Sequence, residues 1–384
     1  MKRSVKRILT THTGSLPRPE GLLALLNAKE AGTLADRAEF DGAVRDAVAE
    51  TVRKQIEAGV DVINDGEMSK VGYSTYVKDR LSGFEGESNA LTGMLADIRD
   101  YPEYAARLFS QTPVALMKMP ACNGDIRYRD EHDLELDIAN LNAATARTKA
   151  EEVFMSAASP GVISVFLVNQ HYKTRDAYLG ALADAMRTEY EAIHRAGLLL
   201  QVDCPDLAMN RHIQFADLKT SEFRKQAAAQ IEALNHALAN VPAEAVRLHL
   251  CWGNYEGPHH RDIAMKDIID IVLKAKVSGI SFEASNPRHE HEWKVWQDVK
   301  LPDGKVLIPG VLDSSTNFIE HPELVAQRLC RFADVVGRER VIAGADCGFA
   351  SFAGSNEVHP SIVWAKFKSL VDGARIASKQ LWKS

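Results

Sequence analysis

The stretch "VRLHLCWGNYEGPHHRDIAMKDIIDIVLKAKVSGISFEASN" (246–286) decides the fold, because it contains one complete repeat of a pattern that runs along the chain. It begins with a short apolar run, continues through a helical pattern over 261–279 and reaches a second apolar run at 280–286. Short continuous apolar runs are typical of strands that are buried on both faces. Such strands alternating with helices predict a parallel sheet covered by helices.

The same alternation extends toward both ends of the chain. Helical patterns occupy 34–58, 178–197, 221–239 and 321–337. Further apolar runs lie at 7–15, 60–67, 161–170, 198–206, 306–315 and 340–349. About seven or eight strands with crossover helices favour an α/β fold of the (β/α)8 TIM-barrel type over an open sheet of about six strands.

Residues from about 84 to 150 interrupt this alternation with segments rich in Asp, Arg and Tyr. We expect them to form an insertion over the barrel mouth rather than a second domain. A single barrel has typically ~250 residues and sometimes more than ~400. Residues 1–384 are therefore predicted to form one domain.

Composition and charge narrow the class of partner. The chain is 46% hydrophobic and 26% charged, as expected for a folded globular protein, and its net charge of −6 argues against binding to nucleic acid or anionic membranes. No apolar run reaches the ~18 residues of a membrane span, and the basic N-terminus lacks the apolar core of a secretory signal. Five scattered cysteines do not suggest a disulfide framework. We expect a cytoplasmic protein that acts on small molecules, with its oligomeric state left open.

Metal-binding side chains recur at the predicted strand ends, which is where such barrels carry their active sites. His249 and Cys251 are two residues apart and share one face of a strand, and Glu283 and Cys347 end two other strands. A single strand cysteine is more often a packed core residue. Together, however, one imidazole, one carboxylate and two thiols form a set suited to tetrahedral zinc.

The charges of these ligands indicate the chemistry. Two thiolates and one carboxylate around Zn²⁺ give a formal charge of about −1 (+2 − 3), which makes the ion a weak activator of water. Hydrolytic zinc sites instead favour neutral histidines and an open position. Metal coordination removes the proton of a thiol, and the thiolate is the nucleophile. The set therefore predicts activation of a small thiol as a zinc thiolate for S-alkylation, with Glu283 giving way to the incoming sulfur.

Several motifs occur in order along the chain and resemble those of one family. They are "ILTTHTGSLPRP" (8–19), "DVINDGEMSK" (61–70), "LLLQVDCPDLAM" (198–209), "LHLCWGN" (248–254), "ISFEASN" (280–286), "PGVLDSS" (309–315) and "VIAGADCGF" (341–349). From residue 7 to about 350 the chain resembles the catalytic barrel of cobalamin-independent methionine synthases. This superfamily includes single-barrel relatives such as the epoxyalkane:coenzyme M transferases. The resemblance places the family's zinc ligands on the same four residues, His249, Cys251, Glu283 and Cys347.

The resemblance also implies where a thiol substrate binds. The substrate-contacting residues of the family fall on Gly14, Ser15, Glu67 and Asp203. The two carboxylates hold the substrate's amino group in methionine synthases, which implies an amino-thiol such as homocysteine. Asp313, at the end of a further predicted strand, joins Glu67 and Asp203 as a candidate catalytic residue. Gly14 could instead only form a turn, and Glu67 could only cap a helix.

Two departures from the family concern the alkyl donor. Ser315 stands where methionine synthases have a proton-donating histidine, and "FASFAG" (349–354) replaces basic residues that face folate. Methyl transfer to homocysteine and opening of an epoxide by a small thiol, without folate, therefore both stay open. Histidines in two polar loops are candidate proton donors, or solvated surface residues. These are His259, His260, His289 and His291.

Two other enzyme classes use similar barrels. A zinc hydrolase would be expected to have ligands richer in histidine and aspartate. A metal-free barrel like that of uroporphyrinogen decarboxylase would give His249, Cys251 and Cys347 no reason to converge. Both are more distant alternatives to a zinc-dependent thiol transferase.

Overall fold

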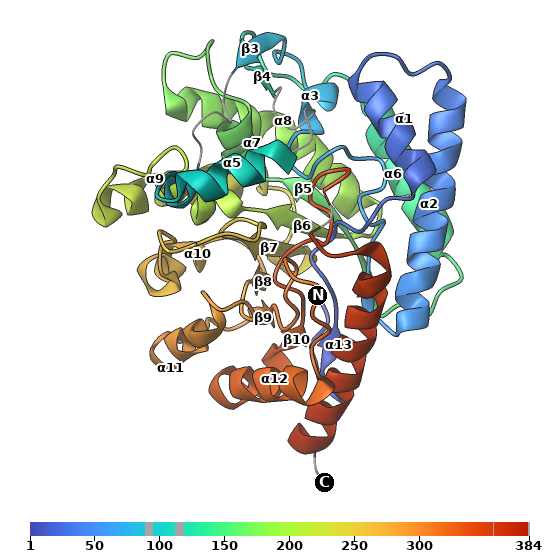
Figure 1. Ribbon diagram of the computed structural model, residues 1–384, viewed down its shortest axis with the longest axis vertical. Helices are drawn as coiled ribbons and strands as arrows, with labels where there is room; N and C mark the ends of the chain where they lie inside the picture. Colours follow the sequence, from blue (N-terminus) through green and yellow to red (C-terminus); the bar gives the residue numbers. More distant parts are fainter. Residues whose placement is uncertain (89–94, 112–118, 356, 383–384) are drawn as a thin grey trace.

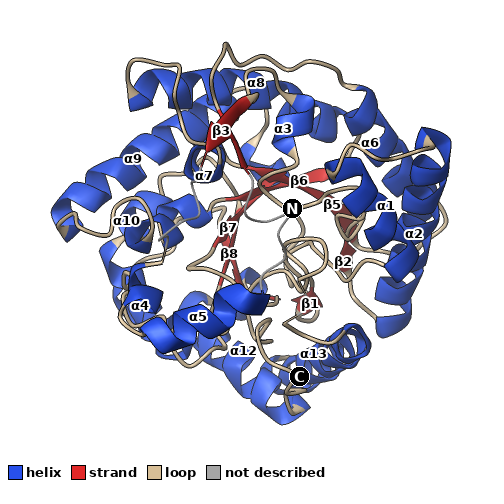
Figure 2. Cartoon of the chain, turned by 45° about the horizontal axis from the view of Figure 1, so that its top comes forward, coloured by secondary structure: helices blue, strands red, loops and turns tan. Residues whose placement is uncertain are grey.

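Eight parallel strands form the centre of the molecule in a computed structural model, which describes residues 1–88, 95–111, 119–355 and 357–382. The strands are β1 (Leu9–Thr10), β2 (Val62–Ile63), β5 (Glu152–Ala158), β6 (Leu199–Asp203), β7 (Val246–Leu250), β8 (Gly279–Phe282), β9 (Val306–Pro309) and β10 (Ile342–Ala343). Figure 2 shows them in the middle of a ring of helices. Their side chains are almost all buried, which explains why they are continuous apolar runs in the sequence.

Hydrogen bonds close the strands into a barrel. β2, β5, β6, β7, β8 and β9 pair in parallel in this order, and β1 pairs with β10. Parallel bridges from Leu307 to Val341 and from Gly310 to Gly344 connect β9 to β10. Between β1 and β2, the Thr11 hydroxyl donates to the Val62 carbonyl over 3.0 Å. The predicted (β/α)8 barrel is therefore confirmed.

Helices surround the barrel and connect its strands (Figure 1). They are α1 (Glu20–Glu30), α2 (Arg37–Ala58), α6 (His132–Thr145), α7 (Pro160–Phe166), α8 (Arg175–Arg195), α9 (Thr220–Ala237), α10 (Ile269–Val272), α11 (Val295–Asp298), α12 (Pro322–Val336) and α13 (Pro360–Leu381). Local signals set their ends. For α2, the Asp36 carboxylate accepts from two backbone amides at the start, and Gly59 ends the helix with a left-handed φ of 85°.

Between β2 and α6 the chain leaves the ring and forms an insertion. Its elements are α3 (Val77–Arg80), β3 (Gly86–Ser88), α4 (Ala96–Arg99), α5 (Pro102–Gln111) and β4 (Met119–Ala121), with β3 and β4 antiparallel. Asp97 accepts from the His259 amide over 3.0 Å, and Asp100 accepts from Arg261 over 2.6 Å. The insertion thus contacts the loop after β7, at the C-terminal end of the barrel. The predicted range 84–150 also includes α6, which packs on α2 in the outer ring.

Two predicted elements differ from the structure. The apolar run 161–170 is not a strand, because α7 begins there and the barrel strand is β5, which ends at Ala158. Ser159 caps α7 through the Val162 amide, and Pro160 takes its first turn, a combination that favours helix over strand. The helical pattern at 261–279 forms only short turns and the four-residue α10.

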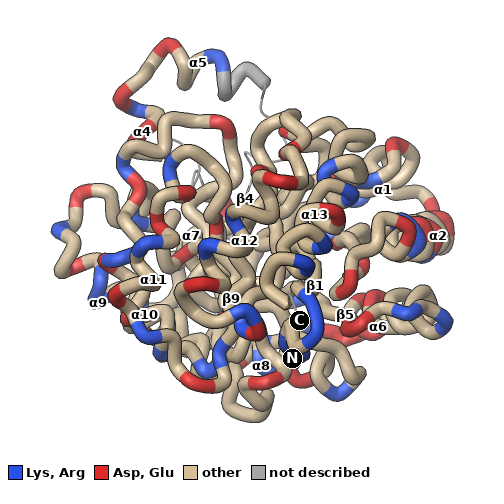
Figure 3. Tube along the Cα trace, turned by 90° about the horizontal axis from the view of Figure 1, so that it is seen from below, with Lys and Arg blue, Asp and Glu red and all other residues tan. Residues whose placement is uncertain are grey.

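The surface carries mixed charge. Figure 3 shows Lys and Arg interspersed with Asp and Glu on the outer helices, including α2 and α6. Many of these charges form exposed pairs, for instance Arg53 with Glu50 and Glu57. Within the described ranges, no helix is long and apolar enough to span a bilayer.

Candidate metal and substrate site

Three of the four predicted metal ligands meet at the C-terminal end of the barrel. His249 lies in β7, Cys251 follows β7, and Cys347 follows β10. One potential ligand atom from each lies within 4.8 Å of the other two, and the two sulfur atoms are 3.6 Å apart. Among the described residues, no other group of His, Cys, Asp or Glu side chains offers three potential ligand atoms this close together.

The surroundings of His249 fit a metal ligand. Its side chain is only 2% exposed, and neither ring nitrogen has a hydrogen-bond partner among the described residues. A buried polar atom without a partner costs roughly 1–3 kcal/mol, so most such atoms in native proteins bind water, an ion or a ligand. Burial, followed by the Arg247 charge, lowers the pKa of His249 to about 3. The imidazole is therefore neutral at pH 7, the form that coordinates a metal.

The Cys251 thiol resists ionisation without a cation. The pKa of Cys251 is raised well above its usual value by its contact with Cys347 and by burial. The Gly253 amide donates to the Cys251 sulfur over 3.3 Å, which partly offsets this effect. A divalent cation between the sulfurs would reverse the balance, because coordinating thiols lose their protons. The donor set therefore fits a soft divalent metal.

The fourth predicted ligand, Glu283, lies beside this group but is not part of it. Its Oε1 accepts from the Trp252 amide and its Oε2 from the Asn286 side-chain amide, both over 2.7 Å. The carboxylate is buried, and burial raises its pKa. The structure therefore holds Glu283 next to the three other donors through bonds to two neighbouring residues.

Asp346 connects the strand ends that carry Glu283 and Cys347. Its carboxylate accepts from the amides of Ala284, Ser285 and Asn286, over 2.8 to 2.9 Å. Burial raises the pKa of Asp346 to about 8, with the Glu283 charge as the second cause. The sequence places Asp346 at a strand end and Asn286 at the end of the motif "ISFEASN", but it does not indicate these roles.

Glu67 and Asp203 form a second, acidic part of the site. Glu67 Oε1 accepts from the Ser156 hydroxyl over 2.7 Å, whereas Oε2 has no partner among the described residues. Burial and the nearby Glu67 charge raise the pKa of Asp203 well above its usual value. Two neighbouring buried carboxylates with a free oxygen are suited to an ammonium group.

The backbone at Glu67 has an unusual conformation that a local hydrogen bond stabilises. Glu67 has a left-handed φ of 58°, which is uncommon for a residue other than glycine and frequent at functional sites. Its amide donates to the Asp65 side chain over 3.0 Å, which stabilises the turn. A Cβ at Gly14 would lie 2.8 Å from Glu67 Oε1, so glycine is needed there for close approach. Gly14 takes a φ of 141° and also borders the Glu67 carboxylate.

The remaining strand-end candidates have different surroundings. Ser15 is buried next to Gly348, where an added Cβ would lie 1.9 Å from its Oγ, and thus borders the turn after Cys347. Asp313 bonds within its own loop, accepting from the Ser315 amide and hydroxyl and from the Thr316 hydroxyl. The candidate metal ligands, Glu67, Asp203 and Ser15 therefore share one end of the barrel, while Asp313 organises the turn after β9.

The four candidate proton donors fall into two pairs. His259 and His289 are largely buried, and each uses both ring nitrogens in contacts of 2.9 to 3.0 Å. His260 is more exposed and contacts Asp100 of the insertion over 2.8 Å, and His291 is exposed. The structure therefore embeds two of these histidines in a polar network and leaves the other two near the surface.

Asp262 is the centre of that network, and nothing in the sequence indicates this role beyond its place shortly after two histidines. His259 and His289 both contact Asp262 Oδ2 over 3.0 Å, and His212 lies 3.1 Å from Oδ1. Despite burial, hydrogen bonds to Asp262 and Glu292 raise the pKa of His289 to about 10. The His289 ring stacks on Trp252 with ring centroids 4.2 Å apart. The network thus supports Trp252, the residue that follows Cys251.

An aromatic wall closes another side of the site. Tyr73, Phe166 and Phe352 pack edge to face, with ring centroids 5.6 to 6.2 Å apart. Burial raises the pKa of Tyr73, and the nearby Cys251 and Cys347 thiols raise it further when they are ionised. Phe352 belongs to the "FASFAG" segment, so an apolar ring stands where the resembled family has basic residues.

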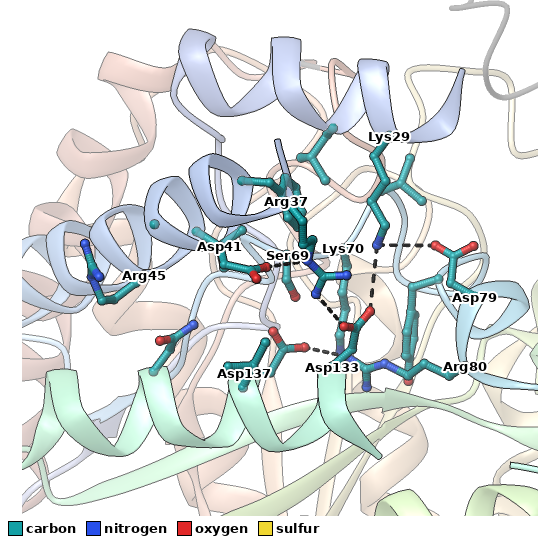
Figure 4. Close-up of a pocket in the computed structure, with 18 of the residues that line it drawn as sticks. Lys29, Arg37, Asp41, Arg45, Ser69, Lys70, Asp79, Arg80, Asp133 and Asp137 are labelled. Atoms are coloured by element: carbon teal, nitrogen blue, oxygen red, sulfur yellow. Dashed lines mark hydrogen bonds and ion pairs between the residues drawn. The ribbon is translucent and has the colours of Figure 1, made fainter. Parts of the chain in front are cut away.

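A separate cavity of about 390 Å³ lies between α1, α2, α3 and α6 (Figure 4). Several of its charged side chains form ion pairs. Arg37 contacts Asp133, and Lys29 lies 3.5 Å from Asp79. Arg80 contacts Asp137 and lies 3.2 Å from Glu189. These pairs explain how the charges are accommodated, and they indicate a structural role.

Comparison with known proteins identifies the family. Residues 127–366 match the family described as "Cobalamin-independent synthase, Catalytic domain". The methionine synthase of Thermococcus kodakarensis is 25% identical over 373 residues, which cover 97% of this chain and 94% of the relative. The methionine synthase of Sulfolobus acidocaldarius is also 25% identical, over 385 residues that cover 100% and 96%.

Solved structures show the same architecture. A B12-independent methionine synthase from Shewanella sp. W3-18-1, in complex with selenomethionine, superposes with a TM-score of 0.73 at 19% identity. The match covers 98% of this chain and 99% of that chain. A putative vitamin-B12-independent methionine synthase from Listeria monocytogenes superposes with a TM-score of 0.66. Since the family match covers well over half of the sequence, the chain belongs to the cobalamin-independent methionine synthase family.

Proposed function

We propose that the protein is a zinc-dependent methyltransferase that methylates the sulfur of homocysteine or a closely related amino-thiol. One observation carries this proposal: the buried His249, with two unpartnered ring nitrogens, lies beside two sulfur atoms at the catalytic end of the barrel. The names of the curated relatives support methyl transfer as the reaction.

His249, Cys251 and Cys347 would hold the metal, with Glu283 next to them as a fourth donor. Bound zinc would lower the pKa of a substrate thiol so that it is a thiolate at neutral pH. The protein excludes water from this place, because all three donors are at most 8% exposed. Exclusion of water increases the nucleophilicity of the thiolate toward the methyl donor.

Glu67 and Asp203 would bind the amino group of the substrate. Glu67 Oε2 has a free position for an N–H donor, as far as the described residues show. A substrate ammonium between the two carboxylates would offset the repulsion that now raises the pKa of Asp203. A sulfur held at the metal and a nitrogen held at these acids would fix both ends of a short amino-thiol.

A second candidate differs only in the donor. The wall of Tyr73, Phe166 and Phe352 is apolar where methylfolate enzymes of the family present basic residues. This favours alkylation of the thiol by a small uncharged electrophile such as an epoxide. Both candidates share the metal, the thiol step and the acidic pair.

Metal analysis combined with X-ray absorption spectroscopy tests the thiol step. The purified protein is expected to contain about one zinc per chain, bound by two sulfurs and lighter atoms. Addition of the correct thiol should add a third sulfur to the shell. Homocysteine, coenzyme M and other thiols are tested one at a time, and then the responding thiol is assayed with methylfolate and with an epoxide. A metal-free protein, or a shell without sulfur, would contradict the proposal.

A further inference from the structure

The position of Glu283 suggests more than a passive ligand. His249, Cys251 and Cys347 each offer a ligand atom within 4.8 Å of the other two, but the Glu283 carboxylate is not part of this group. Instead each oxygen accepts a 2.7 Å hydrogen bond, one from the Trp252 backbone amide and one from the Asn286 side chain. We infer that Trp252 and Asn286 form a docking position that holds Glu283 away from the metal and so frees a coordination position for the substrate thiol. This inference rests on the proposed function.

The orientation of the Asn286 amide is fixed independently of Glu283. Its Oδ1 accepts from the Arg288 amide over 3.0 Å and from the His289 amide over 3.1 Å. A flipped side chain would turn its NH₂ group toward these two donors and lose both bonds. Asn286 must therefore present its N–H groups toward Glu283, whatever the carboxylate does.

The second docking donor is equally fixed. The Trp252 side chain is fully buried, and its indole Nε1 donates to the Ile263 carbonyl over 2.6 Å. The His289 ring stacks on the indole. The amide that faces Glu283 therefore belongs to a backbone segment that is held on both sides.

Asp346 connects the docking position to the metal donors. The Asn286 Nδ2 that donates to Glu283 also lies 3.2 Å from Asp346 Oδ2, and the Asn286 backbone amide donates to the same oxygen. Asp346 directly precedes Cys347 in the chain. The metal donor Cys347 and the Glu283 dock therefore share one rigid support. Asn286 is a positioning residue, because it acts on the site through Glu283.

Removal of the docking position should change two binding equilibria, that of the metal and that of the substrate thiol. In Asn286→Ser the serine hydroxyl can still accept from nearby backbone amides but is too short to reach Glu283. Without the dock, Glu283 should remain on the metal. Hydrogen bonds to charged groups are among the stronger ones in proteins. We expect the thiol-free variant to bind cobalt about tenfold more tightly than wild type and the metal-loaded variant to bind homocysteine about tenfold more weakly.

Cobalt-substituted protein measures both quantities without turnover. Cobalt affinity is obtained by competition with a chelator, and homocysteine affinity by titration of the visible absorption of the bound metal. The matched control is Ser285→Ala, which removes a 2.8 Å bond to the same Asp346 without touching Glu283. Its two affinities should stay within about twofold of wild type.

The outcomes separate the dock from the proposed function. A wild-type protein that binds cobalt but shows no spectral response to any thiol would refute the thiol step. In that case the cobalt affinity of Asn286→Ser would still test whether Asn286 holds Glu283 away from the metal. Unchanged affinities in Asn286→Ser would refute the dock. So would weaker cobalt binding, which would mean that Asn286 helps Glu283 to reach the metal. An equal effect of Ser285→Ala would assign the change to the Asp346 support.

Discussion

Two groups of side chains near Trp252 each contain histidine, and the two groups differ in what their imidazole nitrogens contact. In one group, His249 is buried with both nitrogens unpartnered within the described structure, beside Cys251 and Cys347. In the other group, His259 and His289 use every ring nitrogen, and Asp262 joins them. Both groups are buried and rich in titratable atoms.

The difference teaches how to distinguish a reactive group from a supporting one. In the Asp262 network every ring nitrogen of His259 and His289 has a hydrogen-bond partner, although both nitrogens of His212 and Asp262 Oδ1 have none among the described residues. The paired histidines can therefore support Trp252 without a ligand. The group around His249 cannot do so, because an imidazole and two touching thiols have too few complementary partners. A metal would supply what the protein does not.

Removal of one sulfur from the group of His249, Cys251 and Cys347 should have the largest effect of the predicted changes, and it tests whether this group binds a metal. Cys251→Ser is expected to lower zinc affinity by more than about 100-fold, since loss of even a supporting residue costs 10–100-fold. The barrel should remain folded, because the ligands lie at its mouth. Zinc content and far-UV circular dichroism measure the two effects. Cys122→Ser, another buried cysteine but outside the group, is the control and should keep its zinc. Unfolding of Cys251→Ser alone would show that Cys251 is a core residue.

Asp262→Asn tests the second group of the comparison, the network of His259, His289 and Asp262. It should lower the free energy of unfolding by about 3 kcal/mol near pH 6, because it leaves protonated imidazoles without their buried partner. Zinc content should not change. Urea unfolding followed by tryptophan fluorescence provides the measurement.

The pH dependence of this loss has a defined sign. The pKa of His289 is raised to about 10, so its contribution is complete below about pH 6.5 and is lost as the pH rises toward 10. The pKa of Asp262 is lowered, mainly by hydrogen bonds from the three histidines that outweigh burial, so its contribution is lost below about pH 4. The difference between wild type and variant should therefore shrink on both sides of this window. A difference that is constant from pH 4 to 10 would exclude a charged network.

Asp203→Asn should have a smaller effect, confined to the substrate. Loss of one carboxylate charge should weaken homocysteine binding about tenfold. Isothermal titration with 4-sulfanylbutanoate, which lacks the amino group, is the control and should give equal affinities for wild type and variant. If homocysteine binds both proteins equally, then Asp203 does not contact an amino group.

His260→Ala should have the smallest effect. The pair of His260 and Asp100 is exposed, and exposed pairs contribute roughly 0–1 kcal/mol. We expect unfolding free energy to change by less than about 1 kcal/mol and the transfer rate to stay the same. Loss of a general acid would slow the reaction about 100-fold or more, so a rate measurement decides whether His260 is the proton donor.

The sequence was sufficient for the barrel and for locating three candidate metal ligands that the structure brings together, His249, Cys251 and Cys347. Period and length of the apolar runs locate most strands, and the position of each run determines which residues reach the barrel mouth. The prediction of a strand at 161–170 is wrong, because periodicity cannot distinguish a short buried helix from a buried strand. The Ser159-Pro160 start of α7 was the available signal.

The supporting residues could not be predicted in the same way. Asp262 and Asn286 act through partners that are distant in the chain or that depend on loop geometry, such as the 3.0 Å contact from His289 to Asp262. No spacing rule encodes such contacts. The roles of Glu67 and Asp203, and of Glu283 as a ligand, remain predictions that the experiments above address.

The 3.6 Å separation of the Cys251 and Cys347 sulfurs has a practical consequence for anyone who handles the protein. A metal would keep both sulfurs apart as ligands. When a chelator removes it in air, the same closeness favours oxidation of the pair to a disulfide, since a thiol this near to another needs little motion to react. Metal loss and oxidative inactivation would then be successive steps of one process. Reductant during storage should preserve the ability to take the metal up again.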